Sequence, residues 1–339
     1  MKIIVTGAAG FIGFHFTQKI VELGHQVVGL DNINDYYDVN LKYGRLKELG
    51  FHQEDIHWNR PIQSSKYHDL CTFIRLNLED KQELNELFQE HHFDLVVHLA
   101  AQAGVRYSIE NPSAYVESNV VGFLNILEAS RHFGVRKLMY ASSSSVYGLN
   151  DKIPFSVTDN VDHPISLYAA TKKSNELMAH TYSHLFGIQT IGLRFFTVYG
   201  PWGRPDMAMF LFTDAILNDK PIQVFNEGNL SRDFTYIDDI VGGMLNITKA
   251  FEKNEVTKKY SLYNIGNSQP VKLLDFIEAI EKITGKTAQK TMLPMQPGDV
   301  EKTWADVEDL IQDFNYKPST SIQVGVDEFV NWYKSYFKA

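Results

Sequence analysis

Cysteine, long apolar runs and blocks of like charge are nearly absent from this sequence. Its 339 residues include one cysteine, Cys71, so no disulfide can form within the chain and a reducing compartment is expected. No stretch approaches the roughly 18 apolar residues of a membrane helix, so no membrane span is predicted. The net charge of −9 is spread without long runs of one sign, which argues against a nucleic-acid-binding surface.

A leader and a metal-ligand pattern are also missing. The stretch from Met1 to Gly7 lacks the basic region, apolar run and cleavage site of a signal peptide, so we expect a cytoplasmic protein. His98 and the pair His91-His92 have no second ligand at metal spacing, so no metal site is predicted. Apolar residues, by contrast, make up 44% of the chain, which is enough for a large core.

The chain opens with the pattern of a strand, a glycine turn, a helix and a second strand. Residues 2–6 are rich in β-branched side chains, Gly7, Gly10 and Gly13 follow at once, and the strand at 26–30 ends in Asp31. Glycines let the backbone approach a pyrophosphate at a helix N-terminus, and Asp31 can accept hydrogen bonds from ribose hydroxyls. Its carboxylate repels a 2′-phosphate and no Arg occurs in 32–34, so NAD is favoured over NADP. The alternative is a turn of purely structural use.

Strand and helix patterns alternate from here to about residue 195. Strands are expected at 71–76, 94–99, 135–141 and 189–195, and helices at 81–91, 112–133 and 167–186. This series predicts an α/β fold with a Rossmann-type doubly wound parallel sheet. Residues 35–70, with a short helix near 41–49, are expected to form a long surface segment, and their sequence indicates no function.

The composition changes after Gly200. Helices are expected at 209–217, 236–251, 273–284 and 322–337, with shorter strands at 222–225 and 262–265. We predict an NAD-binding domain at 1–199, onto which about 236–265 partly folds back. A smaller mixed α/β C-terminal substrate domain is predicted at 200–339.

Tyr168 and Lys172 are four residues apart in a predicted helix. That spacing places phenol and ammonium on one face, one turn apart. A neighbouring cation lowers the pKa of a phenol from its ordinary value of about 10, which suits proton transfer near neutral pH. Such a pair alone is more often a surface packing pair. Four serines, Ser142 to Ser145, follow a predicted strand, and the carboxyl ends of parallel strands are where ligands bind.

Four motifs together resemble the extended short-chain dehydrogenase/reductase family, also called the NAD-dependent epimerase/dehydratase family, which mostly acts on nucleotide sugars. They are Gly7-x-x-Gly10-x-x-Gly13, Ser142–Tyr147, Tyr168-x-x-x-Lys172 and Arg232-Asp233-Phe234-Thr235-Tyr236. The sequence segments 31–38, 100–108, 192–207 and 295–300 are similar to those of the UDP-glucuronate 4-epimerases of this family. The resemblance extends from residue 1 to about residue 310.

The resemblance implies reversible C4 epimerisation of a UDP-hexuronate through a 4-keto sugar, with tightly bound NAD, in carbohydrate metabolism and polysaccharide biosynthesis. Tyr168 is the implied base at O4, Lys172 its partner, and Ser143 the hydrogen-bond donor to O4, with Ser142 and Ser144 near enough to leave this choice open. The implied cofactor residues are Gly7, Gly10, Phe11, Ile12, Gly13, Asp31, Asn32, Asn77, Leu78, Ala100, Gln102, Asn119, Tyr168, Lys172 and Phe195.

The implied substrate residues include the serines and two arginine-bearing loops. For the diphosphate, uridine ribose and uracil the resemblance implies Arg232, Asp299 and Phe225, and we predict that Arg106, Thr197 and Arg204 handle the C6 carboxylate. The full implied substrate set is Arg106, Ser142, Ser143, Ser144, Thr197, Arg204, Phe225, Arg232 and Asp299. Arg204 is alternatively a residue that only ties down a proline-rich loop.

Three departures from the family pattern matter for the chemistry. Related dehydratases and decarboxylases carry an Asp or Glu just after the Ser/Thr, where this chain has Ser144 and Ser145, so the 4-keto sugar should be returned rather than eliminated. Many relatives carry Asp at the position of Asn77 and Arg at that of Gln296. The alternative function is a UDP-glucose/UDP-galactose 4-epimerase. The resemblance also suggests a homodimer packed through the helices at roughly 113–133 and 167–186.

Overall fold

A computed structural model describes residues 1–296 and 299–338, and divides the chain into two compact units. The first comprises Met1–Gly148, Asn160–Arg194 and Met244–Tyr263, and the second Leu149–Asp159, Phe195–Gly243 and Asn264–Ala339. Within the described residues, no helix is both long enough and apolar enough to cross a membrane.

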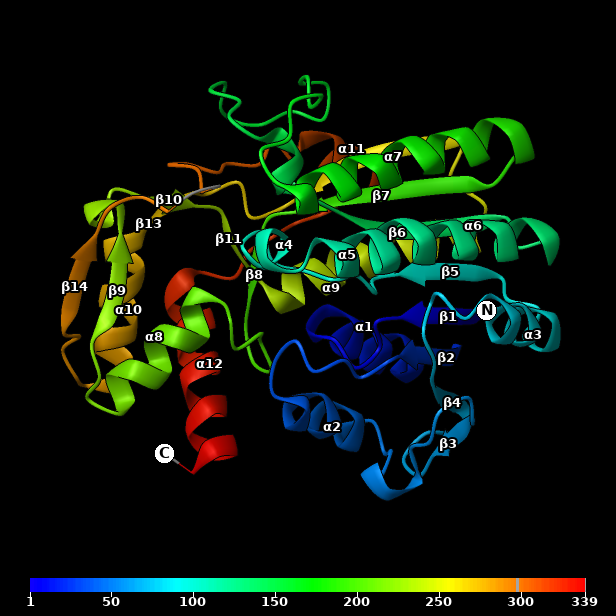
Figure 1. The fold of residues 1–339 in the computed structure, drawn as a ribbon, viewed down its shortest axis with the longest axis horizontal. Helices are drawn as coiled ribbons and strands as arrows, with labels where there is room; N and C mark the ends of the chain where they lie inside the picture. The colour runs from blue at the N-terminus through cyan, green and yellow to red at the C-terminus, as the bar shows by residue number, and fades with distance from the viewer. Residues whose placement is uncertain (297–298, 339) are drawn as a thin grey trace. The chain divides into compact units, whose positions relative to one another are not determined.

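The first unit is built on a large sheet (Figure 1). Its strands are β1 (Lys2–Thr6), β2 (Gln26–Asp31), β3 (Ile62–Ser64), β4 (His68–Arg75), β5 (Leu95–His98), β6 (Lys137–Ser143) and β7 (Gln189–Phe195), joined by β12 (Tyr260–Ile265) from late in the chain. The eight strands run in the order β12-β7-β6-β5-β1-β2-β4-β3. Strand β1 pairs in parallel with both β2 and β5, whereas the edge strand β3 pairs antiparallel to β4. The predicted α/β, Rossmann-type fold class is confirmed.

The order in which the chain adds strands to the sheet reverses between β1 and β5, although these two strands are parallel. From β1 the chain proceeds through β2 to β4, and from β5 it proceeds in the other direction through β6 to β7. In open α/β sheets, ligands bind outside the strand carboxyl ends at such a switch point. The glycine turn after β1 and the segment after β5 therefore lie where a ligand is expected.

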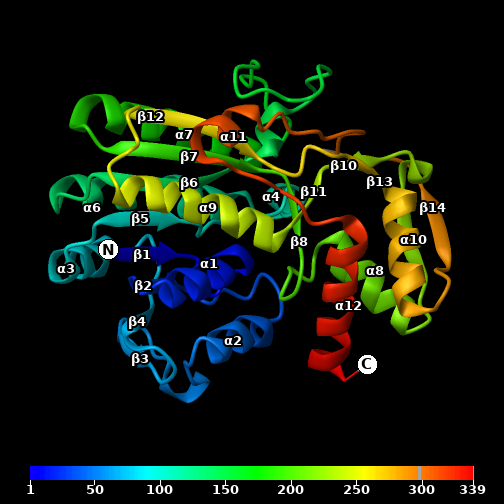
Figure 2. The same ribbon diagram turned by 180° about the vertical axis from the view of Figure 1, so that it is seen from behind.

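Helices cover both faces of this sheet. They are α1 (Phe11–Glu22), α2 (Val39–Glu48), α3 (Lys81–His91), α4 (Tyr107–Glu110), α5 (Pro112–Tyr115), α6 (Gly122–His132), α7 (Leu167–Phe186) and residues 244–252 of α9 (Ile237–Glu252), with 3₁₀ turns η1 (Gln53–Asp55) and η3 (Ser144–Tyr147). Helices α3, α6 and α7 lie on one face, and α1 and α9 on the other (Figures 1 and 2).

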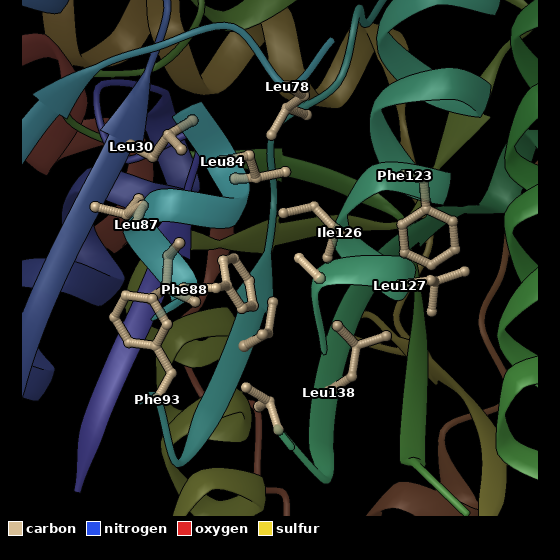
Figure 3. Packing of buried hydrophobic residues seen from close by; sticks show 14 of the residues in the cluster. Leu30, Leu78, Leu84, Leu87, Phe88, Phe93, Phe123, Ile126, Leu127 and Leu138 are labelled. Carbon is tan, nitrogen blue, oxygen red and sulfur yellow. The ribbon is translucent and has the colours of Figure 1, made fainter. Parts of the chain in front are cut away.

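Apolar side chains at helical spacing form the core beneath α3 and α6. Leu84, Leu87 and Phe88 occupy positions i, i+3 and i+4 of α3, and α6 repeats this spacing with Phe123, Ile126 and Leu127. All six are at most 4% exposed and belong, with Leu138 of β6, to one buried apolar cluster, part of which Figure 3 shows. This spacing gives each helix one apolar stripe, which is why both pack against the sheet.

The helix expected over residues 112–133 is confirmed from 112 to 132, but it is not α-helical throughout. A π-helical turn, η2 (Val116–Val121), separates α5 from α6. The wider turn alters the backbone hydrogen bonding, and the carbonyl of Asn119 accepts a bond of 2.6 Å from Asn175 Nδ2 on α7. Periodicity could not distinguish this turn from α-helix because the flanking apolar positions keep a helical spacing.

The second unit contains short sheets and helices. Its elements are β8 (Thr197–Tyr199), α8 (Ala208–Leu217), β9 (Ile222–Phe225), η4 (Asn226–Gly228), β10 (Ser231–Arg232), β11 (Phe234–Tyr236), β13 (Val271–Lys272), α10 (Leu273–Thr284), β14 (Lys290–Leu293), α11 (Glu308–Phe314) and α12 (Ile322–Phe337). Pairs β9–β14 and β8–β11 are parallel, and β10–β13 is antiparallel. Strands β10, β13 and β14 and helix α11 are too short or too polar for the sequence pattern to have indicated them.

Candidate active site

The glycine turn after β1 has no room for side chains. Gly7 has φ +75°, and a Cβ there would lie 2.7 Å from the backbone nitrogen of Ala100, just beyond β5. A Cβ on Gly13 would lie 2.1 Å from the carbonyl oxygen of Gly7, and one on Gly10 2.9 Å from the same atom. No side chain of the described residues caps the N-terminus of α1, so its N–H groups face a cradle that only glycine permits. This geometry fits a pyrophosphate group.

Asp31 ends β2 beside this turn. Its carboxylate accepts hydrogen bonds from the backbone N–H groups of Ala9 (3.2 Å) and Ile33 (2.8 Å). The ammonium of Lys42, on α2, lies 3.7 Å from Asp31 Oδ1, and both side chains are less than 10% exposed. Residues 32–34 contain no cation, and this one comes instead from α2, which begins eight residues after Asp31, so the local sequence does not indicate it.

The other predicted cofactor residues lie around the same turn. Asn32 Nδ2 donates to Asn77 Oδ1 at 3.2 Å, so these two predicted residues are neighbours. The N–H of Ala100 donates to Thr6 Oγ1 at 3.2 Å, which fixes the start of the segment after β5. Leu78 is buried. Phe195, at the end of β7, belongs to the second compact unit, whereas all the other predicted cofactor residues belong to the first.

Asn119 joins the segment after β5 to helix α7. Its Oδ1 accepts from the N–H of Gln102 (2.8 Å), and its Nδ2 donates to the carbonyl of Gln102 (3.0 Å) and to Thr171 Oγ1 (3.1 Å). Thr171 in turn donates to the carbonyl of Tyr168 (2.8 Å). The 1% exposed Asn119 side chain therefore holds two predicted cofactor residues, Gln102 and Tyr168, in a common framework.

Tyr168 and Lys172 lie one turn apart near the start of α7. Ser166 caps this helix by accepting the N–H of Ala169 at 3.1 Å. Lys172 is 2% exposed, and its ammonium donates to the carbonyl of Ala141 at 2.9 Å. Burial lowers the pKa of Lys172 to about 8. Tyr168 is half-buried, and its ring meets Tyr115 edge-on at a centroid distance of 6.0 Å.

His98, at the end of β5, is a neutral neighbour of this pair. It is 2% exposed, and its Nδ1 lies 2.9 Å from Thr6 Oγ1. Burial, assisted by the charge of Lys172, lowers the pKa of His98 to about 3. The imidazole therefore adds no second positive charge next to Lys172. No group of three or more His, Cys, Asp or Glu side chains able to hold a metal ion occurs among the residues that the structure describes.

The serines at the end of β6 differ in their contacts. Ser142 Oγ donates to Glu176 Oε1 at 2.7 Å inside the unit. Ser143 Oγ accepts from the N–H of Ser145 at 3.1 Å and donates to its hydroxyl at 3.1 Å, at the start of η3. The predicted strand at 135–141 extends in the structure to Ser143. Ser142 thus bonds a buried carboxylate and Ser143 bonds Ser145, and which serine donates to a ligand stays a prediction.

In the second unit, Arg232 and Asp299 are brought together. Arg232 Nη2 donates to Asp299 Oδ1 at 2.6 Å, and its Nη1 donates to the carbonyls of Ser231 and Glu301 at 3.1 Å each. Phe225 ends β9 opposite Leu293 of β14. Two residues of the motif at 295–300, Pro297 and Gly298, lie outside the described residues.

A buried carboxylate fixes the backbone next to Arg232. Asp233 is fully buried and accepts hydrogen bonds from Thr235 Oγ1 and from the N–H groups of Asn267, Ser268 and Ala305 at 2.7–3.1 Å. Burial raises the pKa of Asp233, although these four hydrogen bonds oppose the change. The motif around Arg232 does not reveal this role of Asp233, because three of its four donors lie 34 to 72 residues further along the chain.

The three residues predicted to contact a carboxylate differ in their contacts. Arg204 forms a two-point ion pair with Asp206, of which the Nε–Oδ1 distance is 3.0 Å. The N–H of Thr197 donates to the carbonyl of Asp233 at 3.1 Å. Arg106 is exposed just before α4, and its guanidinium makes no hydrogen bond or ion pair with a described residue.

Comparison with known proteins places this geometry in a family. The model of the NAD dependent epimerase/dehydratase family matches residues 3–266. A probable UDP-glucuronate 4-epimerase from Rhizobium meliloti is 45% identical, over 100% of this chain and 98% of its own length.

Two solved structures are similar over nearly their whole length. One is the UDP-glucuronic acid 4-epimerase of Bacillus cereus in complex with UDP-glucuronic acid and NAD (35% identity, TM-score 0.87, 99% of this chain and 100% of that chain). The other is the UDP-glucose 4-epimerase of Thermotoga maritima with UDP-glucose (27% identity, TM-score 0.85, 99% and 100%). The chain belongs to the NAD-dependent epimerase/dehydratase family.

Proposed function

We propose that this protein catalyses the reversible C4 epimerisation of UDP-glucuronate to UDP-galacturonate through a 4-keto sugar. Tyr168, held as a phenolate by the adjacent Lys172 ammonium, removes the proton of the sugar O4 and becomes a neutral phenol. Bound NAD, which the glycine turn and Asp31 would hold, would supply a reversible acceptor for the C4 hydride, so that the reaction involves no net oxidation. After the 4-keto sugar has turned over, Tyr168 gives the proton back to O4 on the opposite face.

The observation that carries this proposal is the isolated ammonium of Lys172. It is buried one turn from Tyr168, and among the described residues no carboxylate lies within ion-pair distance of its Nζ. A buried cation without an anion is unfavourable unless a partner charge appears. A phenolate at Tyr168 supplies that charge, which is the protonation state that a base at O4 requires.

The substrate assignment rests on the C6 carboxylate. The relative from Rhizobium meliloti and the Bacillus cereus structure are both named for UDP-glucuronate. Arg106, Thr197 and Arg204 remain our predicted contacts of this carboxylate. Ser144 and Ser145 stand where related dehydratases carry an acid, so no side chain there promotes elimination from the 4-keto sugar.

The two compact units take different parts of the reactants in this proposal. The first unit, with the glycine turn and Asp31, holds NAD, and the second binds the UDP moiety. Arg232 contacts the diphosphate, Asp299 the uridine ribose and Phe225 the uracil. The pairing of Arg232 with Asp299 supports this assignment, because both must be near one nucleotide.

Proton NMR of UDP-glucuronate with the purified protein, without added NAD, tests the function. We expect UDP-galacturonate to appear up to an equilibrium mixture, since the cofactor stays bound. Tyr168→Phe protein should retain its fold and NAD but lose about 100- to 10,000-fold in rate, the usual contribution of an acid–base group. Formation of a UDP-pentose instead would show a decarboxylase.

The second candidate is a UDP-glucose/UDP-galactose 4-epimerase, which the likeness to the Thermotoga maritima enzyme favours. The two candidates differ in substrate preference. Faster turnover of UDP-glucose than of UDP-glucuronate would establish the second candidate and contradict the roles predicted for Arg106 and Arg204.

We also propose a cytoplasmic homodimer that packs through α5, α6 and α7. Leu124, on α6, is 40% exposed, and Leu177 and Leu185 of α7 are 58% and 62% exposed. Large apolar side chains on neighbouring helices mark an association surface. Light scattering should give twice the chain mass of 38.8 kDa, and Leu177→Glu should reduce it to the monomer mass. A monomeric parent protein would contradict this proposal.

A further inference from the structure

Residues 34–45, whose role the sequence did not disclose, bring two buried cations to the glycine turn. Helix α2 begins after Asp38, whose side chain accepts the N–H of Asn40 at 2.9 Å. Lys42 and Arg45 then lie one turn apart on its buried face, at 5% and 0% exposure. Lysine and arginine are rarely buried unless they are paired, so each must have a specific partner here.

Arg45 fixes the helix to the turn. Its Nη1 donates to the carbonyl of Ala9 at 2.9 Å and to the hydroxyl of Tyr37 at 2.7 Å. The Ala9 N–H at the same time donates to Asp31 at 3.2 Å. The peptide groups on both sides of Ala9 are therefore held by charged side chains, and α2 has a defined position relative to Asp31.

Because Arg45 holds α2 against the glycine turn, Lys42 on the same helix face lies next to Asp31. Its ammonium lies 3.7 Å from Asp31 Oδ1, donates to Asn34 Oδ1 at 2.8 Å and stands 5.3 Å from the ring centroid of Tyr37. Asp31 and Lys42 together have no net charge. A ligand group that forms a hydrogen bond with Asp31 therefore meets a carboxylate whose negative charge is balanced by Lys42. The local sequence around Asp31 shows no such cation.

This changes the expected selectivity for the cofactor. An isolated carboxylate at the end of β2 accepts hydrogen bonds from both ribose hydroxyls and repels a 2′-phosphate. At a site with little solvent, a cation a few ångströms from that acid offsets much of the repulsion. Because Lys42 is buried, its effect is also screened little by salt.

We propose that Lys42 is a specificity-determining residue of the cofactor site, where it offsets the charge of Asp31 and reduces the discrimination against a 2′-phosphorylated dinucleotide. The proposal rests on the assignment of Asp31 to the adenosine ribose. It concerns the ratio of two affinities and not the rate of epimerisation.

The test measures the dissociation constants of NAD and NADP by calorimetry on the cofactor-stripped full-length protein. In Lys42→Met, which keeps the length of the side chain, we expect the ratio of the NADP constant to the NAD constant to rise about tenfold. Lys42→Gln keeps a donor toward Asn34 without the charge and should raise the ratio equally, whereas Lys42→Arg should preserve it. Lys47→Met, at an exposed position of the same helix, is the matched control and should leave the ratio unchanged.

Each remaining outcome has one meaning. Equal weakening of NAD and NADP in Lys42→Met would show an ion pair that only supports the fold, and an unchanged ratio in Lys42→Gln would exclude the charge effect; either result overturns the proposal. Asp31→Asn tests by itself whether Asp31 contacts the ribose. If it does, removing its negative charge should lower the ratio of the NADP constant to the NAD constant. If that variant changes neither constant, the assignment of Asp31 is wrong, and the proposal for Lys42 is overturned with it.

Discussion

Glu176 and Arg194 form a two-point ion pair inside the first unit, with Nε–Oε1 and Nη2–Oε2 distances of 2.8 and 2.9 Å and both side chains 1% exposed. Burial works against the charged guanidinium, but the hydrogen bonds and charge of Glu176 outweigh it, so the pKa of Arg194 is raised. Glu176 lies one helical turn beyond Lys172 on α7 and also accepts the hydroxyl of Ser142. One carboxylate thus joins α7, which carries Tyr168, to the ends of β6 and β7.

Glu176→Gln should therefore affect both stability and catalysis. Leaving the guanidinium of Arg194 buried without its carboxylate costs about 3–5 kcal/mol of unfolding free energy. Because one carboxylate oxygen becomes an amide NH2 that faces the donors of Arg194, the connection from α7 to β6 and β7 is disturbed. We therefore expect kcat to fall about tenfold with little change in KM, as for other residues that position catalytic groups.

Urea unfolding and steady-state kinetics measure the two effects of Glu176→Gln. Glu90→Gln, at an exposed position of α3, is the control and should change neither quantity. A normal kcat in a destabilised Glu176→Gln protein would restrict the ion pair to a structural role.

Lys172→Met should stabilise the cofactor-free protein near pH 7. Burial holds the pKa of Lys172 at about 8 in the folded chain, against 10.5 in its ordinary environment. Below pH 8 the folded protein therefore bears the full cost of a buried charge, about 3 kcal/mol. Between about pH 8 and 10.5 the unfolded chain holds a proton that the folded chain has released, so the stability contributed by this group rises with pH.

The stability difference between Lys172→Met and the parent should accordingly shrink from pH 8 to pH 10. Urea unfolding at unit steps from pH 7 to pH 10 measures it, with Lys173→Met, on the same helix, as control. A difference that stays constant with pH would mean that Lys172 keeps its ordinary pKa in the folded chain.

The sequence predicted those elements whose ends carry a local signal. The expected helices at 81–91, 273–284 and 322–337 and the strand at 189–195 have these bounds in the structure. Helix α10, for example, ends before Gly285, which adopts φ +71°. A glycine at this position ends a helix without any tertiary contact, so the sequence alone is enough to predict where the helix ends.

The candidate site was predictable as a set of motifs but not as a set of contacts. The glycine spacing and the Tyr168–Lys172 pair depend on neighbours within one turn or loop. The direction of the Ser142 hydroxyl depends on Glu176, 34 residues away, and the charge at Asp31 depends on a lysine of α2. In a polar segment such as residues 39–48, a lysine that faces inward has the same local pattern as one that faces solvent.

Arg204→Met should lower kcat/KM for UDP-glucuronate more than for UDP-glucose. A charged hydrogen bond to the C6 carboxylate contributes about 1.5–3 kcal/mol, so a selective loss of roughly 10- to 100-fold is expected. Asp206→Asn keeps the guanidinium but weakens its ion pair within the loop, and its effect should be smaller. Equal losses for both variants and both substrates would show that Arg204 only holds the loop.

Gly13→Ala and Gly242→Ala should change stability in opposite directions, although both glycines lie inside helices. At Gly242, on α9, a Cβ meets no atom of the described residues within 4 Å, so alanine should stabilise the protein by up to about 1 kcal/mol through its helix propensity. At Gly13 a Cβ would lie 2.1 Å from the carbonyl oxygen of Gly7, which must move and open the turn. Gly13→Ala protein should therefore unfold at lower urea concentration and be purified without NAD, as measured by the absorbance of its perchloric acid extract. NAD retained at the parent level in Gly13→Ala would show that the pyrophosphate does not bind at this turn.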